Sequence, residues 1–342
     1  DKARDRIAKS INADRGEIFF TSGGTEANNW AIIGLALANR NKGNHIITSQ
    51  IEHHSVLEAC KRLETMGFEV TYLPVDETGL VDIAELIHCV NQKTILVSIM
   101  AANNEIGTIQ NLKTISKIAH ERDIIFHTDA VQAVNSFKID VLDIEVDAMS
   151  ISAHKLHGPK GVGALYVKKG VKIDNLIVGG NQERGKRGGT LNVASIVGFG
   201  KALDVTARDY IVNNKRLRFL REYFLSKVME EIPNVKINGH KFQSLPGLIS
   251  ISFIGVEGEA LTTLLDLAGI AVSTGSACSA GSSHEQSHVL KALGLPQEYA
   301  QGTVRFSFGV NNTKAEIDIV VEELKKDVER LRELSPIRSK NK

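Results

Sequence analysis

Two short apolar runs near the middle of the chain each end in a cluster of polar and charged side chains. Residues 124–126 lead into a cluster with Asp129 and Gln132, and residues 148–151 lead into Ser152, His154 and Lys155. Such runs predict buried strands, and the stretch between them is long enough for one crossover between parallel neighbours. Because the carboxyl ends of parallel strands meet at one edge of a sheet, we expect both clusters to face the same ligand.

These residue types suit pyridoxal 5′-phosphate (PLP). A lysine amine can bond to its aldehyde, and an aspartate can keep the pyridine nitrogen protonated, so that the ring withdraws electrons from a substrate. Ser152 and His154 can donate hydrogen bonds to the phosphate. Taken alone, Ser-x-His-Lys is also compatible with an ordinary surface lysine in a turn. The motifs described below argue against that simpler interpretation.

The composition is that of an ordinary globular protein, with 342 residues, 42% hydrophobic and 24% charged. A formal net charge of +1 provides no field that would attract nucleic acid or membrane. The cysteines, Cys60, Cys89 and Cys278, offer no disulfide framework, and the sequence contains no apolar run of transmembrane length and no signal peptide. We therefore predict a cytoplasmic protein without nucleic-acid or membrane binding, and we assign no metal ligands.

Strand-like and helix-like patterns alternate along most of the chain. The expected strands are residues 17–21, 45–49, 69–75, 94–100, 124–128, 148–152 and 163–167, and helical patterns include 27–39, 55–66 and 112–121. This alternation predicts an α/β fold with a mainly parallel seven-stranded sheet and helices on both faces. Residues 157–161 are too few for a crossover, so the strand after them should run antiparallel to its predecessor.

A long charged helical stretch, residues 194–232, separates this region from a second one. We place the domain boundary inside that stretch, which gives a large PLP-binding domain of residues 1–207 and a small α+β C-terminal domain of residues 208–342. In the second domain we expect strands at 248–253, 270–273 and 303–308. Thr313 and Glu316 form a capping box that opens a last helix, whose apolar stripe indicates core packing.

Two loops stand out for their chemistry. Residues 21–29 place Gly23, Gly24 and Thr25 between a strand and a helix, where backbone amides and the helix dipole can bind a phosphate; the alternative is a tight turn capped by Thr25. Cys278 lies among Gly, Ser and Ala residues, which predicts an exposed loop thiol; the alternative is an incidental cysteine.

In their order along the chain, these motifs resemble the cysteine desulfurases of the NifS/IscS type, within the class V aminotransferase branch of fold-type I PLP enzymes. The resemblance covers nearly the whole chain. It rests on residues 19–26, Glu52-His53, residues 103–107, 129–132, 152–155 and 187–190, the Cys278 loop and residues 304–307.

The resemblance implies a role for each matching position. Lys155, His53 and Cys278 would be catalytic: Lys155 holds PLP and moves protons at the substrate α-carbon, His53 stacks on the ring and assists, and Cys278 attacks the sulfur of cysteine. The cofactor-binding residues would be Gly24, Thr25, Asp129 (at the ring nitrogen), Gln132 (at the ring hydroxyl), Ser152, His154, Lys155 and, from a partner subunit, Thr190. Asn104 and Arg305 would bind the substrate carboxylate.

The implied reaction converts L-cysteine to L-alanine and leaves a persulfide on Cys278, in a homodimer that passes sulfur to an acceptor such as an iron–sulfur scaffold or to tRNA thiolation. Two alternatives stay open: a selenocysteine lyase or other PLP β-lyase, and a non-catalytic PLP-fold interaction module. The sequence departs from the family pattern in two ways. It starts after the usual Leu-Asp-Asn-Ala-Ala-Thr-like motif, so we expect a fragment or reduced activity, and residues 282–286 lack the usual apolar-acidic-Pro stretch.

Overall fold

The computed structural model describes residues 1–274 and 286–334, and these form two compact units. The first unit comprises Asp1–Pro74, Val81–Asn103 and Gln110–Tyr210. The second comprises Val75–Leu80, Asn104–Ile109 and the described part of Ile211–Lys342. Helix α7 (Val193–Glu231) contributes to both, and the domain boundary predicted after residue 207 falls in this helix.

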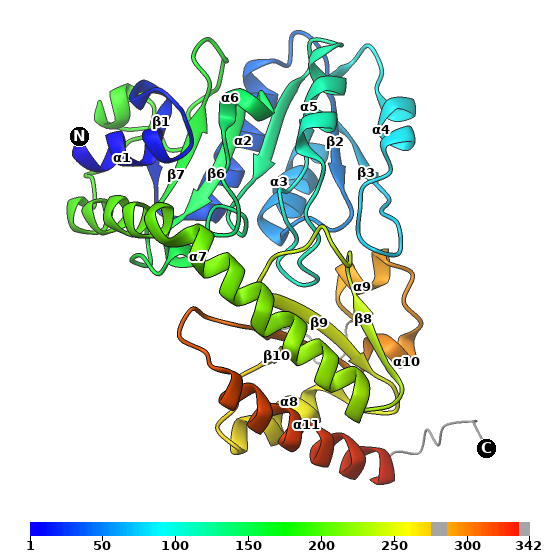
Figure 1. Ribbon diagram of the computed structural model, residues 1–342. Coiled ribbons are helices and arrows are strands. Elements are labelled where there is room, and N and C mark those ends of the chain that lie inside the picture. Colours follow the sequence, from blue (N-terminus) through cyan, green and yellow to red (C-terminus); the bar gives the residue numbers. More distant parts are fainter. Residues whose placement is uncertain (275–285, 335–342) are drawn as a thin grey trace. The chain divides into compact units, whose positions relative to one another are not determined.

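The first unit is built on a seven-stranded sheet with the strand order β1-β7-β6-β5-β4-β2-β3 (Figure 1). Its strands are β1 (Ile18–Thr21), β2 (His45–Ser49), β3 (Glu69–Leu73), β4 (Thr94–Ser98), β5 (Ile125–Asp129), β6 (Ala148–Ser152) and β7 (Gly163–Val167). The pairs from β3 across to β6 are parallel, whereas β7 runs antiparallel to both β6 and β1. The predicted α/β class, the strand number and the antiparallel return are therefore confirmed.

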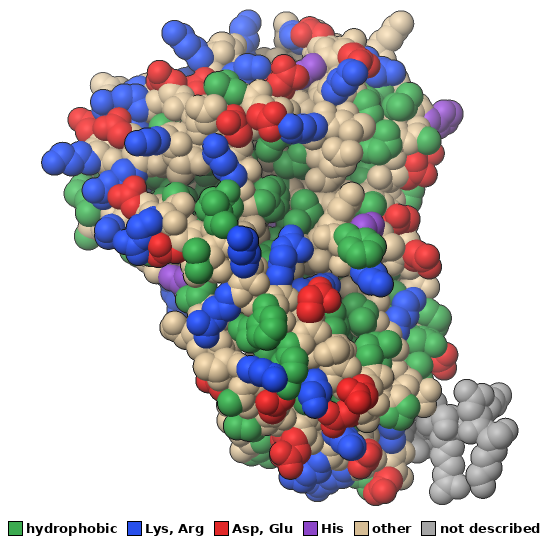
Figure 2. Space-filling model, in the orientation of Figure 1, with side chains coloured by type: hydrophobic (Ala, Val, Ile, Leu, Met, Phe, Trp, Pro, Cys, Tyr) green, Lys and Arg blue, Asp and Glu red, His purple; other side chains and the backbone are tan. Residues whose placement is uncertain are grey.

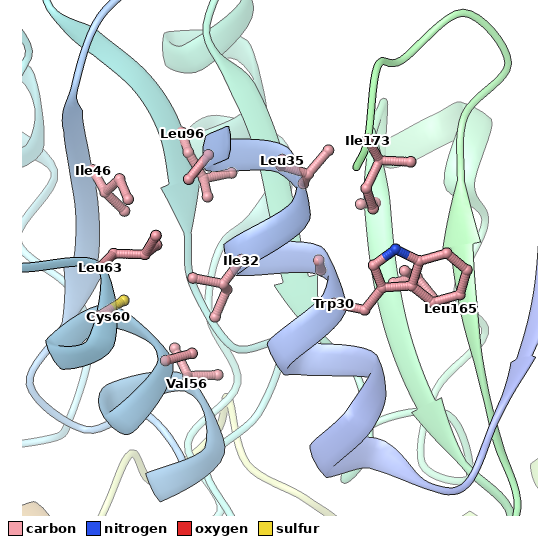
Figure 3. Packing of buried hydrophobic residues seen from close by; sticks show 14 of the residues in the cluster. Trp30, Ile32, Leu35, Ile46, Val56, Cys60, Leu63, Leu96, Leu165 and Ile173 are labelled. Carbon is pink, nitrogen blue, oxygen red and sulfur yellow. The ribbon is translucent and has the colours of Figure 1, made fainter. Parts of the chain in front are cut away.

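Helices cover this sheet because their apolar faces need a partner. The helices are α1 (Lys2–Ser10), α2 (Gly24–Ala38), α3 (His54–Glu64), α4 (Ile83–Cys89), α5 (Leu112–His120) and α6 (Val141–Ile144). Figure 1 shows α5 in front of the strands and α2 behind them. In Figure 3, Trp30, Ile32 and Leu35 of α2 pack among side chains of α3 and the sheet, where each is 1% exposed or less.

Three short 3-10 segments lie in the first unit: η1 (Arg15–Glu17), η2 (Ala153–Leu156) and η3 (Gln182–Gly185). The second of them begins directly after β6, so the polar residues at that strand end stand on a tight turn. Asp129 is the last residue of β5, the neighbour of β6 in the sheet. The sheet thus brings the two polar clusters to one edge, as the sequence predicts.

The second unit holds an antiparallel four-stranded sheet with the order β10-β11-β9-β8. Its strands are β8 (Val235–Asn238), β9 (Leu248–Phe253), β10 (Ser273–Thr274) and β11 (Thr303–Ser307), and its helices, besides α7, are α8 (Gly258–Leu267), α9 (His288–Ala292), α10 (Gln297–Ala300) and α11 (Lys314–Leu334). Phe224 of α7 packs against Phe306 of β11 in its core.

Two details of the second unit bear on the sequence analysis. The capping box at the start of α11 is present: the Thr313 amide donates to Glu316 Oε2 (2.7 Å), and the Glu316 amide donates to Thr313 Oγ1 (3.3 Å). The prediction of a strand at residues 270–273 is wrong for most of that range, because β10 comprises Ser273–Thr274. Gly269 adopts a left-handed φ of 80°, and its turn ties Ile270 back to Leu265, so pairing begins only at Ser273.

On the face shown in Figure 2, basic and acidic side chains are interspersed. This mixture fits the near-zero formal net charge of the chain. None of the helices formed by residues 1–274 and 286–334 is both long and apolar enough to cross a membrane.

Candidate active site

Asp129 is buried at the carboxyl end of β5, with both of its oxygens held in place. The Asn28 side chain donates to Oδ2 (2.6 Å), and the Val131 amide donates to Oδ1 (2.9 Å). Burial raises the pKa of this carboxyl, while these two donors and the neighbouring His53 and Lys155 act in the opposite direction. Each oxygen keeps a further acceptor position, so the group can receive a cationic N–H from a ligand.

His53 is linked to Asp129 through a chain of hydrogen bonds. Asn28 donates to Ser55 Oγ (2.9 Å) as well as to Asp129, and Ser55 Oγ lies 2.8 Å from His53 Nδ1. The Ser55 amide also donates to His53 Nδ1 (3.1 Å), which makes His53 the N-cap of α3. A backbone amide can only donate, so Nδ1 is the acceptor and the neutral ring carries its proton on Nε2.

The pKa of His53 is lowered. Burial is the main cause, and the charges of His54 and Lys155 add to it, whereas Asp129 opposes it. Near neutral pH the imidazole is therefore uncharged and can accept or return a proton. The hydrogen-bond chain through Asn28 and Ser55 joins His53 to Asp129, and the charge of Lys155 lowers the pKa of both groups.

Lys155 lies on the η2 turn, one residue beyond His154. Asn135 donates to the Lys155 carbonyl (3.0 Å), which holds the turn, while the Lys155 side chain is exposed. Ser152 Oγ and His154 Nδ1 lie 2.7 Å apart, and the pKa of His154 is lowered by burial and by the neighbouring charges of Lys155 and Lys160. The two candidate phosphate donors are thus adjacent, and the lysine follows them directly.

The loop before α2 lies against both strand ends. A Cβ on Gly24 would meet Val131 Cγ2 at 2.7 Å and Ser152 Cβ at 3.5 Å, so only glycine fits there. Helix α2 begins at Gly24 with Gly23 as its N-cap, not Thr25 as the tight-turn alternative supposed. Thr25 is exposed in the first turn of α2. The glycine therefore places the free amides of a helix start beside Ser152 and the turn after Asp129.

The remaining predicted residues lie in different places. Gln132 is half-buried in the turn after Asp129, and Thr190 is exposed in the loop before α7. Asn104 and Arg305 lie in the second unit, where Arg305 Nη1 donates to the Asn104 carbonyl (2.9 Å). Within residues 1–274 and 286–334, nothing accepts a hydrogen bond from the buried Nε of Arg305. Cys278 lies outside the described residues.

Comparison with known proteins identifies the family. The profile of the family Aminotransferase class-V matches residues 1–320. The chain is 53% identical to a cysteine desulfurase IscS of Clostridium botulinum over 337 residues, which is 98% of this chain and 85% of that protein. It is 44% identical to a cysteine desulfurase of Homo sapiens over 339 residues, 98% of this chain and 74% of that protein.

The chain belongs to the cysteine desulfurase family.

Solved structures agree with this assignment. A structure described as a NifS-like protein has a TM-score of 0.90 and 40% identity, covering 96% of this chain and 87% of its own. A structure of SspA in complex with cysteine has a TM-score of 0.78 and 36% identity, covering 91% and 87%. These matches confirm the resemblance seen in the sequence motifs. Because cysteine desulfurases and class V aminotransferases are PLP-dependent enzymes, they also confirm the predicted cofactor.

The residues of this desulfurase fit PLP. A buried carboxylate held by two donors suits a protonated ring nitrogen. The start of α2 at Gly24, which lies next to Ser152, suits a phosphate. The sequence analysis missed the parts that join these groups. Asn28 and Ser55 bridge Asp129 to His53, although Asn28 lies within the glycine-rich motif that was recognised. The sequence signal that could have identified Asn28 is an amide at a position of the expected helix between the apolar Ala27 and Trp30, because a buried amide needs a hydrogen-bond partner.

Proposed function

We propose that this chain acts on L-cysteine, with Lys155 bonding to the PLP aldehyde and Cys278 accepting the sulfur. The observation that carries the proposal is the buried Asp129–Asn28–Ser55–His53 network beside Lys155. When bound, PLP withdraws electrons from the substrate α-carbon and weakens the bonds there. Asp129 would keep the ring nitrogen protonated, and Gln132 would hydrogen-bond the ring hydroxyl.

The phosphate would be bound at Gly24, Thr25, Ser152 and His154, with Thr190 of the partner subunit adding a donor. The support is the helix start beside Ser152 together with the adjacent Ser152 and His154 side chains. Two or more donors are needed because a phosphate dianion is only partly neutralised by one helix terminus.

Proton transfer would fall to Lys155 and His53. The neutral His53 ring offers Nε2, since Nδ1 is already engaged as an acceptor. In the second unit, Arg305 has a buried Nε without an acceptor among the described residues, and a substrate carboxylate would satisfy it; Asn104 lies next to it.

The sulfur step balances without a further reactant. The Cys278 thiolate bonds to the sulfur of L-cysteine, the carbon–sulfur bond of the substrate breaks, and its electron pair takes a proton at the former β-carbon. The products are L-alanine and a persulfide on Cys278. We propose further that the enzyme is a cytoplasmic homodimer and that it delivers this sulfur to a protein acceptor such as an iron–sulfur scaffold, or to tRNA thiolation.

The test uses the purified chain loaded with PLP. We expect equal yields of alanine and, with added thiol, sulfide from L-cysteine. Borohydride reduction followed by peptide mapping should place the phosphopyridoxyl label on Lys155, and Lys155→Ala should remove it. A label on another lysine, or alanine formation that survives Lys155→Ala, would contradict the proposed site.

A further inference from the structure

An ion pair not used in the proposed reaction ties the glycine-rich loop to a segment far along the chain. Arg187 donates from Nε to Glu26 Oε1 (2.9 Å) and from Nη2 to Glu26 Oε2 (3.0 Å). Both side chains are largely buried, with 18% and 9% exposed. Glu26 also accepts from the Ser22 amide (2.8 Å), which joins it to the loop in front of α2. Two parallel N–H···O bonds of this kind define the geometry of the pair, and removing one partner of a buried pair leaves an uncompensated charge.

The position of Glu26 creates an electrostatic problem for a phosphate site. The residue lies in the first turn of α2, beside the helix start that would bind the phosphate dianion. Burial raises the pKa of Glu26, but the bonds from Arg187 and Ser22 outweigh it, so the net pKa is lowered and the group is a carboxylate. An unpaired carboxylate there would repel a dianion through a medium of low polarity.

The loop that carries Arg187 is built to hold the guanidinium in place. A Cβ on Gly188 would meet Gly179 Cα at 2.8 Å, and the Gly188 amide donates to the Ile177 carbonyl (2.9 Å). The Gly189 amide donates to Gln182 Oε1 (3.2 Å), which closes the loop on itself. The backbone that follows Arg187 is therefore held in place where the guanidinium meets Glu26.

A second ion pair, between Glu183 and Arg4, contacts strand β1, which leads into the glycine-rich loop before α2. Glu183 accepts from the Phe20 amide (2.8 Å) and forms a two-bond pair with Arg4 (2.6 and 2.9 Å). Glu183 and its neighbour Arg184 both adopt left-handed φ angles, 46° and 58°, which non-glycine residues rarely do. Two carboxylates thus bind alternate amides of the segment 20–22, and each has its own arginine.

We propose that Arg187 is a positioning residue for the cofactor phosphate: it cancels the charge of Glu26, so that the start of α2 can accept a dianion while Glu26 still shapes the loop. The inference rests on the proposed function, because it concerns the same PLP site. The proposal predicts opposite effects on phosphate binding when the charge of Glu26 or that of Arg187 is removed. Loss of Arg187 exposes a repelling carboxylate, whereas loss of the Glu26 charge leaves an attracting cation.

The experiment compares PLP with pyridoxal, which lacks the phosphate. The dissociation constant of each is measured on the cofactor-free full chain by the absorbance change on bonding to lysine, and the ratio of pyridoxal to PLP constants defines the phosphate selectivity. We expect Arg187→Met to lower this selectivity at least about tenfold, which corresponds to ~1.4 kcal/mol. Arg187→Lys should lose less, since it keeps the charge.

Glu26→Gln separates electrostatics from structure. Glutamine can still accept from the Ser22 amide, so we expect the selectivity to stay at or above that of wild type. The double variant Glu26→Gln/Arg187→Met should return to within about threefold of wild type, because the two charges are removed together. Lys113→Met is the control, since it removes one positive charge from an exposed pair with Asp143 (2.7 Å).

The outcomes are distinct. If Arg187→Met keeps the wild-type selectivity, or if Glu26→Gln lowers it as much as Arg187→Met does, the charge argument is wrong. If Arg187→Met does not fold, Glu26→Gln alone decides, because only a purely structural pair predicts a loss there. A wild-type chain that bonds neither PLP nor pyridoxal would instead refute the proposed function.

Discussion

Asn28→Ala is the substitution that tests the site most directly. The Asn28 side chain is buried and donates to both Asp129 and Ser55, so its removal cuts the chain between the carboxylate and His53. A hydrogen bond to a charged group contributes ~1.5–3 kcal/mol, which corresponds to a rise of ~1–2 units in the pKa of Asp129. The loss of this bond together with the neutral bond to Ser55, which contributes ~0.5–1.5 kcal/mol, should also reduce the free energy of unfolding by ~2–4 kcal/mol.

The sign of the pH effect follows from the direction of that shift. In the proposed role Asp129 acts as a carboxylate beside a protonated ring nitrogen, and the hydrogen bond from Asn28 favours that ionised form. Without Asn28 the carboxyl takes up a proton at higher pH, so the acid limb of kcat/KM should move toward neutral by ~1–2 units. The variant should therefore lose more activity at pH 6 than at pH 8.5.

The assay is alanine formation from L-cysteine between pH 5.5 and 9, with PLP occupancy recorded by absorbance at each pH. Asn29→Ala is a matched control on the same helix, because Asn29 donates to the backbone carbonyls of Thr25 (2.9 Å) and Ser55 (3.3 Å) and not to Asp129 or His53. If Asn28→Ala and Asn29→Ala give the same acid limb at full PLP occupancy, the network does not tune Asp129.

Four further predictions follow from the same structure. Cys278→Ser should keep PLP and still bind cysteine but form no persulfide; alanine production equal to wild type without added thiol would exclude Cys278 as the acceptor. Arg305→Ala should raise KM for cysteine and lower kcat/KM at least tenfold, because removing one partner of the proposed pair between Arg305 and the substrate carboxylate costs ~2–5 kcal/mol. An unchanged KM would remove Arg305 from the site. Mixing Lys155→Ala subunits with subunits lacking the Thr190 loop should restore part of the activity if the sites are shared in a homodimer; no recovery despite proven subunit exchange would oppose it. Burial raises the pKa of Glu52 to about 8, so the folded protein binds this proton more tightly than the unfolded chain does. The stability of the wild type should therefore fall between about pH 5 and 8 more steeply than that of Glu52→Gln. Thermal unfolding at several pH values checks this, and equal slopes for the two proteins would contradict it.

Local patterns predicted much of the first unit. Strands β2, β6 and β7 begin and end at the residues expected from the sequence, because short apolar runs bounded by polar turns leave little freedom for a buried strand. The positions of Asp129 and Lys155 followed from the same argument, since parallel strands end at one edge of a sheet. Strand β8 of the second unit was not predicted, because Val235, Lys236 and Ile237 are only partly buried and its one buried residue, Asn238, is polar.

Contacts between distant residues could not be predicted in this way. Asn28 meets Asp129 across 101 positions of sequence, and Glu26 meets Arg187 across 161. Periodicity reports which face of an element is buried, but a side chain's hydrogen-bond partner depends on how elements pack. Residues 75–80 and 104–109, which lie within the first half of the chain, belong to the second unit for the same reason.

The sequence by itself therefore determined the family, the α/β class and the chemical character of the site, because residue types and their order along the chain carry that information. Only the tertiary structure decided which distant groups meet there: the Asn28 amide contacts Asp129, Gly24 brings the start of α2 to Ser152, and Arg187 pairs with Glu26. A charge or a hydrogen bond acts over a few ångströms, and that proximity exists only once the chain has folded.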